Sequence, residues 1–506
     1  MSCFPWLPAE LIHEIFSSPC LSQLDLSVLA RASRDWHNIA TPILWRRLPG
    51  LLPLLKLIPE DASSIIPIQC EDERLTGYPI ECITITRPLI EEDWTPVYRR
   101  AVLVKDLEVH ASYSPLCSEF TTQTLEAIAA CPPSRCLLPE LRSLHLDINL
   151  RHVFHTNTHL TSLLEILLSP NITGNLVEDL RFEKDLGFTR LTEAHAAMLV
   201  NAAATRWTHL KSVSLQVELC GPSLLATFSQ MPALELLKLA FEQSAEESDI
   251  IPVSLTPGFL SLRSLELGAV ASDAAAAVLQ SWDLRALQSF EITRIHNCAK
   301  PEDLLQAIHD CIAHDALRVL SIEADFTTGP APMLEHLRPI AVFRRLVDVF
   351  IDVNEGLLLT DDDHAQLAGW WPEAEYIFFN SESHCRISNL CTPATLHCLT
   401  HYARCCPRLQ ELCLPLVAHP PIPVVPADTP SGHPLYDLEI GDAPLYAEDA
   451  AEVAQFLVGV FPHLEEVEYL DRGYSVAWKH VNALLEYRNH QAQLDRGCSD
   501  SRRHSI

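Results

Sequence analysis

The stretch Leu141-Arg142-Ser143-Leu144-His145-Leu146 places apolar residues at its first, fourth and sixth positions. The same spacing returns in Ile80–Ile85, Val104–Val109, Val177–Phe182, Leu210–Leu215, Leu234–Leu239, Leu262–Leu267 and Leu287–Ile292, and in segments that start at Leu317, Leu346, Ala374, Leu409, Leu435 and Leu464. So short an alternation of apolar and polar residues predicts a β-strand with one covered face. We therefore expect an inward orientation for the apolar residues Leu144, Leu146, Leu265, Leu267, Leu320 and Leu438.

These fourteen segments recur about every 29.5 residues between positions 80 and 464. Apolar residues at helical spacing lie between them, in Thr158–Ser169, Thr192–Trp207, Ser272–Trp282, Pro301–His314, Thr392–Cys406 and Glu448–Phe461. One strand and one helix per unit, at this period, is typical of leucine-rich repeats. The predicted fold is an α/β horseshoe with parallel strands on the concave side and helices outside. Its curvature is expected to be irregular, because the Asn of the usual repeat occurs once, at Asn149.

Composition shifts divide the chain further. A linker over 49–78 is expected to pack on a repeat array that covers 79–471. Residues 414–434 contain seven prolines, which predicts an extended insertion inside the array. A capping helix is predicted over 472–491 and a disordered tail over 492–506.

The charge of the chain restricts its partners. Asp and Glu exceed Lys and Arg by 30, so phosphate backbones and acidic lipids are repelled. We therefore expect neither nucleic-acid nor membrane binding. The first residues lack the basic region of a signal peptide, and the 17 cysteines are scattered and odd in number. Reduced thiols in the cytoplasm or nucleus are the natural interpretation.

Residues 1–48 predict three short helices. Pro8 suits the first turn of one helix, which Pro19 ends. Asp25 is expected to cap a second helix that Trp36 closes, and Pro42 to open a third. So small a bundle cannot bury all of its Leu, Ile, Phe and Trp side chains. The surplus apolar surface is expected to dock on another protein.

This segment resembles an F-box, through Leu7-Pro8-x-Glu10-Leu11, Ile15-Phe16, Asp25-Leu26, Leu29-Ala30, Arg34-x-Trp36 and Leu44-Trp45. Ser33 stands where many F-boxes carry Cys. The resemblance implies docking onto the Skp adaptor of a Skp–cullin–F-box ubiquitin ligase. The adaptor-binding residues that it implies are Leu7, Pro8, Leu11, Ile15, Phe16, Leu24, Leu26, Leu29, Trp36 and Trp45.

Together, the two parts resemble fungal-type F-box proteins with leucine-rich repeats. That resemblance implies a non-catalytic substrate receptor, in which the F-box binds the adaptor, and through it cullin, while the repeats bind a protein to be ubiquitinated. An interaction scaffold whose F-box acts outside a ligase is the alternative.

Catalytic motifs are absent from the sequence, and we expect no cofactor. Cys398, His401 and Cys405 share one face of a predicted helix, but no C-x-x-C pair accompanies them. Buried cysteines are the preferred interpretation of this cluster, and an enzyme with its site on this helix is a further alternative. The run Asp361–Asp363 precedes a helical stretch, so it is interpreted as a helix cap and not as a metal site.

The polar positions of the last repeats alternate with the apolar ones and are expected to project from the concave face. The predicted substrate-binding residues among them are Asp348, Phe350, Asp352, Tyr376, Phe378, Asp437, Glu439, Glu466 and Glu468, with Asn380, Glu411 and Cys413 beside them. Aromatic anchors between carboxylates favour a basic partner and disfavour a phosphorylated one. Alternatively, any face of so acidic a chain looks negative, and Phe350 or Phe378 packs against a loop.

Overall fold

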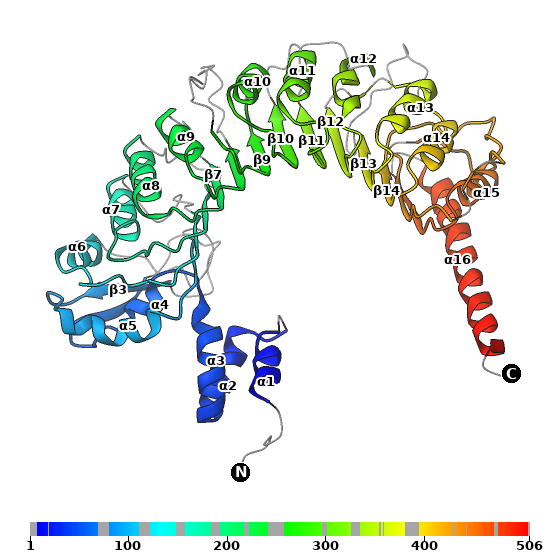
Figure 1. Cartoon of the computed structure of the whole chain (residues 1–506). Coiled ribbons are helices and arrows are strands. Elements are labelled where there is room, and N and C mark those ends of the chain that lie inside the picture. The colour runs from blue at the N-terminus through cyan, green and yellow to red at the C-terminus, as the bar shows by residue number, and fades with distance from the viewer. Residues whose placement is uncertain are drawn as a thin grey trace. The chain divides into compact units, whose positions relative to one another are not determined.

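The computed structural model describes residues 8–18, 20–68, 80–110, 122–147, 157–183, 193–216, 222–240, 258–295, 301–324, 334–353, 356–357, 359–379, 394–427, 429–430, 432–441, 443–469 and 474–503. The chain divides into two compact units, Met1–Glu242 and Gln243–Ile506. In both units, parallel strands alternate with helices (Figure 1), and three helices precede the strands of the first unit. The predicted α/β repeat solenoid behind N-terminal helices is thereby confirmed. None of the described helices is both long and apolar enough to cross a membrane.

The three N-terminal helices are α1 (Ala9–Phe16), α2 (Gln23–Ala32) and α3 (Arg34–Arg46). α2 begins with a capping box: the Ser22 hydroxyl accepts from the Asp25 N–H at 3.2 Å, and the Asp25 carboxylate accepts from the Ser22 N–H at 2.9 Å. The Ser33 hydroxyl caps α3 in the same way, because it accepts from the Trp36 N–H at 3.1 Å.

Three helix boundaries differ from the sequence prediction. Asp25 does not precede α2 as its cap, because Ser22 is the N-cap and Asp25 lies in the first turn of the helix. Trp36 does not close α2, because the Ser33 cap starts a new helix before it. Pro42 does not open a helix but lies inside α3, where its ring removes one backbone hydrogen bond. The helix continues through this position because Ala40 before it and Ile43 and Leu44 after it pack on the core of the three helices.

The chain passes from α3 directly into the sheet of the first unit. The short strand β1 (Arg47–Leu48) pairs in parallel with β4 (Asp106–His110). β3 (Ile80–Ile85), predicted from the sequence as the first repeat strand, instead pairs antiparallel with β2 (Ser63–Ile68) in a separate two-stranded sheet. Alternation predicted the strand itself, but it carries no information about the partner.

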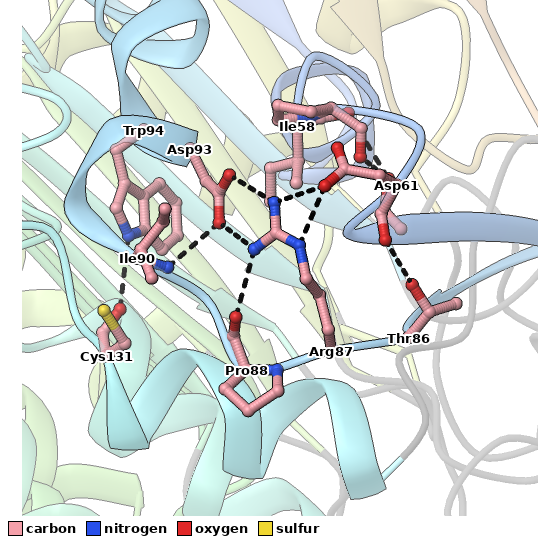
Figure 2. Close-up of polar contacts among 11 residues, drawn as sticks. Ile58, Asp61, Thr86, Arg87, Pro88, Ile90, Asp93, Trp94 and Cys131 are labelled. Atoms are coloured by element: carbon pink, nitrogen blue, oxygen red, sulfur yellow. Dashed lines mark hydrogen bonds and ion pairs between the residues drawn. The ribbon is translucent and has the colours of Figure 1, made fainter.

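The segment between β1 and β4 is fixed by one arginine. Between them lie α4 (Leu52–Leu55), the two antiparallel strands, the 3₁₀ helix η2 (Glu91–Trp94) and α5 (Thr95–Ala101). Figure 2 shows the Arg87 guanidinium between two carboxylates: its Nη1 and Nη2 donate to the buried Asp93 at 2.8 and 2.9 Å, and its Nε donates to Asp61 at 2.9 Å. Such two-pronged, charge-assisted bonds fix the loop before β2 to η2.

In the first unit, β4, β5 (Ser143–Asp147), β6 (Asp179–Glu183), β7 (Ser212–Gln216) and β8 (Leu236–Ala240) pair in parallel, each with the next. The helices between them are α6 (Thr122–Ala130), α7 (Asn157–Leu167), α8 (Glu193–Arg206) and α9 (Pro222–Ser229).

In the second unit, the parallel strands are β9 (Ser264–Gly268), β10 (Ser289–Ile295), β11 (Val319–Ala324), β12 (Asp348–Val353), β13 (Tyr376–Phe379), β14 (Glu411–Cys413), β15 (Asp437–Glu439) and β16 (Glu466–Glu468). Its helices are α10 (Ser272–Ser281), α11 (Pro301–Cys311), α12 (Leu334–Leu337), the 3₁₀ helix η3 (Arg338–Val342), α13 (Asp361–Trp370), α14 (His397–Cys405), α15 (Ala450–Val460) and α16 (Ser475–Arg503).

The core lies between these strands and helices. Each of the six leucines predicted to point inward is 0% exposed, namely Leu144, Leu146, Leu265, Leu267, Leu320 and Leu438. Because side chains alternate along a strand, this burial places the intervening polar residues on the other face of each sheet.

The Pro-rich segment contains no helix or strand over 414–427, 429–430 and 432–434. Its start is anchored, since Leu414, Leu416 and Ala418 are buried. Gly459 of α15 leaves room for the side chain of Val425, because a Cβ built on this glycine would lie 2.5 Å from the valine Cγ2. The segment therefore packs on α15 as an extended connection between β14 and β15.

The last helix differs from the prediction at its end. α16 continues to Arg503, past residue 491, where the sequence predicted a disordered tail. Its extension begins with the good helix formers Ala492, Gln493 and Leu494, and no proline interrupts it, although Gly497 is a poor helix former. The start of α16 packs on the sheet, because Ala477, Trp478, Val481 and Leu485 are buried.

Candidate functional site

Large apolar side chains lie exposed on the outer sides of α1 and α2. On α1, Leu11 is 45% and Ile15 51% exposed; on α2, Leu24 is 71% and Val28 52% exposed. Each pair is spaced by one helical turn, so each helix presents a short apolar stripe. Exposed stripes of this kind mark surfaces where another protein docks.

The opposite sides of α1 and α2 form a small core together with α3. Phe16, Leu26 and Ala40 are buried there, and Leu29 and Trp36 pack against them partly buried. The rings of Phe16 and Trp36 meet edge to face, with centroids 5.7 Å apart. Phe16 and Leu26, which the sequence resemblance placed at the adaptor, therefore belong to this core, where they are 5% and 7% exposed.

The remaining predicted adaptor residues divide as follows. Pro8, Leu11, Ile15 and Leu24 face outward, and Leu7 lies outside the described residues. Val28 was missed by the sequence prediction, although its spacing of four residues from Leu24 was a signal that could have found it.

Trp45 lies at the junction between the helices and the first strands. The Arg100 guanidinium of α5 lies 5.9 Å from the centroid of the half-buried Trp45 ring. Beside it, the Arg46 Nε lies 3.7 Å from the Asp106 carboxylate, and Arg47 pairs with Glu108. Trp45 therefore helps to join α3 to the first repeats and does not lie on the outer stripes.

Comparison with known proteins identifies this helical segment. Residues 4–48 match the family model described as F-box-like. The chain contains an F-box-like domain. No curated protein matches the chain. A solved structure, described as the Rad7 and Elc1 complex in yeast, aligns with 84% of this chain and 92% of its own, at 14% identity and a TM-score of 0.31.

A second candidate surface lies on the sheet face of the second unit, away from its buried leucines. Paired strand positions form a continuous row across β9 to β16. In strand order, this row consists of Glu266, Glu291, Ser321, Phe350, Phe378, Cys413, Glu439 and Glu468. We call it the aromatic–acidic row. A parallel row two residues earlier contains Asp348, Tyr376, Glu411, Asp437 and Glu466.

The structure thus brings together, on one face, the residues that the sequence predicted for substrate binding. Asp352 follows Phe350 by two residues on β12, and Asn380 lies outside the described residues. Glu266 and Glu291 belong to the same row, but they lie on β9 and β10, before the strands that carry the predicted residues. Phe350 and Phe378 are half-buried against each other, with ring centroids 6.0 Å apart.

Carboxylates crowd one another on this face. Burial, together with Glu291 and Glu411, raises the pKa of Asp348. Burial, together with Glu468, Glu411 and Glu466, raises the pKa of Asp437. The hydroxyl of Tyr436 donates to Glu411, which raises the tyrosine pKa to about 12. Burial is the largest cause of the two aspartate shifts, and the neighbouring carboxylates add to both.

The structure places Cys398, His401 and Cys405 on α14. Cys398 is fully buried, and burial raises the pKa of its thiol well above the usual value. His401 is half-exposed, and burial is the largest cause of its lowered pKa. Among the described residues, no group of three or more His, Cys, Asp or Glu side chains could hold a metal ion.

The Asp361–Asp363 run occupies the first turn of α13. Asp363 completes a capping box with Thr360, whose N–H and hydroxyl donate to it at 2.9 and 2.8 Å. Asp361 accepts from the N–H and the hydroxyl of Thr395 at 2.8 and 2.7 Å. These carboxylates therefore join the start of α13 to the segment before α14.

Proposed function

We propose that this chain is the substrate-recognition subunit of a Skp–cullin–F-box E3 ubiquitin ligase. Its F-box-like domain binds a Skp-type adaptor and, through the adaptor, cullin. The repeats bind the protein that is to be ubiquitinated. The chain contributes no catalytic group. It raises the local concentration of a substrate lysine near the partner enzyme of the ligase that carries ubiquitin. The complex works in the cytoplasm or nucleus.

One observation carries this proposal: the segment that matches the F-box-like model exposes Leu11 and Ile15 on one side of α1. Burying a leucine or isoleucine side chain contributes about 1.5–3 kcal/mol. The two α1 residues therefore suffice for a hot spot, which the exposed Leu24 and Val28 of α2 extend.

The junction after α3 supports the same function. β1 follows α3 without a loop and pairs with β4, so the helices are attached to the first repeats through a paired strand. A substrate receptor needs such a connection, because a lysine must be held within reach of a distant enzyme.

Affinity purification of the tagged full-length chain tests this function. We expect both a Skp-type adaptor and cullin to co-purify, and a Leu11→Ala, Ile15→Ala double variant to lose both. Val476, which is 72% exposed on α16, provides the matched control Val476→Ala. Recovery of the adaptor without cullin would instead indicate an interaction scaffold outside a ligase.

A further inference from the structure

The order of residues in the aromatic–acidic row is nearly symmetric. Phe350 and Phe378 occupy the two central strands, β12 and β13. A small residue follows on each side, Ser321 on β11 and Cys413 on β14. Two carboxylates then end the row at each side, on β9 and β10 and on β15 and β16.

Cations are nearly missing from these strands. The eight strands β9–β16 contain ten Asp or Glu residues and one Lys or Arg, Arg294, which lies exposed where the register of β10 shifts. The raised pKa values of Asp348 and Asp437 agree with this imbalance, since neighbouring carboxylates contribute to both. A cationic partner is therefore complementary to this face.

The aromatic pair supplies an apolar contact on the same face. The helices of the unit lie on the other side of its strands (Figure 1), toward the buried leucines. Phe350 and Phe378 lie beside each other and are only half-buried, so part of each ring surface is accessible. Aromatic side chains enclosed by polar ones are common interface hot spots.

We propose that this face binds a Lys- or Arg-rich segment of a protein substrate, with one apolar side chain on Phe350 and Phe378 and basic side chains on the flanking carboxylates. This inference rests on the proposed function, because it names the substrate class of the repeats. A second copy of the chain is a poor occupant, since its net charge of −30 repels the row.

The strand spacing sets the sequence of that segment. Glu291 lies two strands from Phe350, and Glu439 lies two strands from Phe378. Neighbouring strands are about 4.8 Å apart, so each carboxylate is about 10 Å from the nearer ring along the row. A polyproline II chain advances about 3.1 Å per residue and presents every third side chain on one face. Glu291 and Glu439 are five strands, or about 24 Å, apart. Basic residues three positions before and three positions after one apolar anchor are about 19 Å apart on such a chain, and the long side chains of Lys or Arg cover the remaining distance of about 3 Å at each end. This is the fitting pattern.

Fluorescence anisotropy with the purified full-length chain tests this inference. The probe is a short labelled Pro-rich peptide in which one Leu has a Lys three positions away on each side. We expect saturable binding that weakens as salt rises through about 0.1–0.5 M. A peptide of the same composition, with both Lys next to the Leu, should bind at least about tenfold more weakly, because the spacing no longer matches.

Variants of the chain complete the experiment. Phe350→Ala should weaken binding about tenfold, and so should Glu291→Gln combined with Glu439→Gln, which should also flatten the salt dependence. The exposed Glu302 of α11 and Glu452 of α15 provide a matched pair of charge changes on helices, Glu302→Gln with Glu452→Gln. This control should bind like the wild type.

Three results would overturn the inference. The first is no saturable binding, and the second is equal binding of both peptides. The third is an equal loss of peptide affinity in the Glu291→Gln, Glu439→Gln variant and in the Glu302→Gln, Glu452→Gln control. The last would assign binding to the overall charge of the chain. Adaptor affinity, measured on the same preparations, keeps the two proposals apart. The row variants should retain it, whereas a wild-type chain that binds no adaptor contradicts the proposed function whatever the peptides do.

Discussion

The side chain of Asn482 on α16 takes the place of a neighbouring strand for Val467 of β16. The Asn482 Oδ1 accepts from the Val467 N–H at 3.0 Å, and the Asn482 Nδ2 donates to the Val467 carbonyl at 2.9 Å. Both backbone groups belong to the last strand of the second unit, where no further strand is paired among the described residues. An edge strand with unpaired backbone groups invites pairing with other chains. Asn482 therefore closes this end of the sheet.

Replacing Asn482 with Ala should destabilise the second unit. Loss of the two bonds leaves a backbone donor and acceptor without their partners, which costs about 1–3 kcal/mol. Chemical denaturation measures this loss, and light scattering detects association through the opened edge. Glu486→Ala, on an exposed position of the same helix, is the control. Equal stability of the two variants would show that Asn482 does not support the edge.

The Arg87 and Asp93 pair predicts a pH-dependent loss. Hydrogen bonds from Arg87 are the largest cause of the lowered pKa of the buried Asp93. Arg87→Ala leaves this carboxylate without its charge-assisted bonds and should lower the free energy of unfolding near pH 7. Because the folded pKa lies below the unfolded value of about 3.9, the stabilisation is present above that value and is lost as pH falls through the folded pKa. The difference between variant and wild type should therefore shrink below about pH 4.

The exposed pair of Arg285 and Asp283 provides the comparison for Arg87. Arg285 is 86% exposed and its Nε lies 3.6 Å from the carboxylate, so Arg285→Ala should cost less than about 1 kcal/mol. A similar cost for both arginines, or a cost for Arg87→Ala that does not vary between pH 7 and pH 3, would contradict the assigned role of Arg87.

Two leucines distinguish the core from the surface of the second unit. Leu320 on β11 is 0% exposed, whereas Leu260 before β9 is 74% exposed. Leu320→Ala should cost about 2–5 kcal/mol, because it leaves a cavity between the strands and the helices. Leu260→Ala should leave the free energy of unfolding nearly unchanged. Hydrogen exchange should show earliest loss of protection in β10 and β12, the neighbours of β11, since repeats depend on adjacent repeats.

Burial of His364 predicts a second pH effect. Its Nδ1 lies 2.8 Å from the Tyr402 hydroxyl, and burial lowers its pKa from 6.5 to about 4. The unfolded chain therefore binds a proton that the folded chain does not between these values, and stability falls as pH drops through them, by up to about 3 kcal/mol. His364→Gln should remove this part of the pH dependence. Parallel stability curves for variant and wild type from pH 7.5 to 4.5 would contradict the assignment.

The repeats could be predicted because one local rule governs them. Leu144 and Leu320 sit at the same motif position in different repeats, and alternation alone placed both in the core. The partner of Ile80–Ile85 could not be predicted in this way, because β2 precedes it in an irregular segment and a strand pattern does not name its neighbour.

On both candidate surfaces, the residues could be predicted from the sequence, but their arrangement could not. α1 has apolar residues on both sides, Leu11 and Ile15 outside and Phe16 inside. Local spacing cannot select the inward side, since the packing of α2 and α3 decides it. On the sheet, the aromatic residues and carboxylates were predicted from their positions in the motif. Their alignment into one row depends on the strand register, which brings Glu291 and Glu439 to equal distances from the aromatic pair.

The affinity of the purified chain for a purified Skp-type adaptor, measured by isothermal titration calorimetry, tests the central claim most directly. We expect the wild type and the Val476→Ala control to bind equally. The Leu11→Ala, Ile15→Ala double variant should bind at least about a hundredfold more weakly, because each truncated hot-spot side chain costs roughly 2 kcal/mol. Equal affinities for the double variant and the wild type, or no binding of the wild type, would contradict the claim that α1 docks this chain onto the adaptor of a ubiquitin ligase.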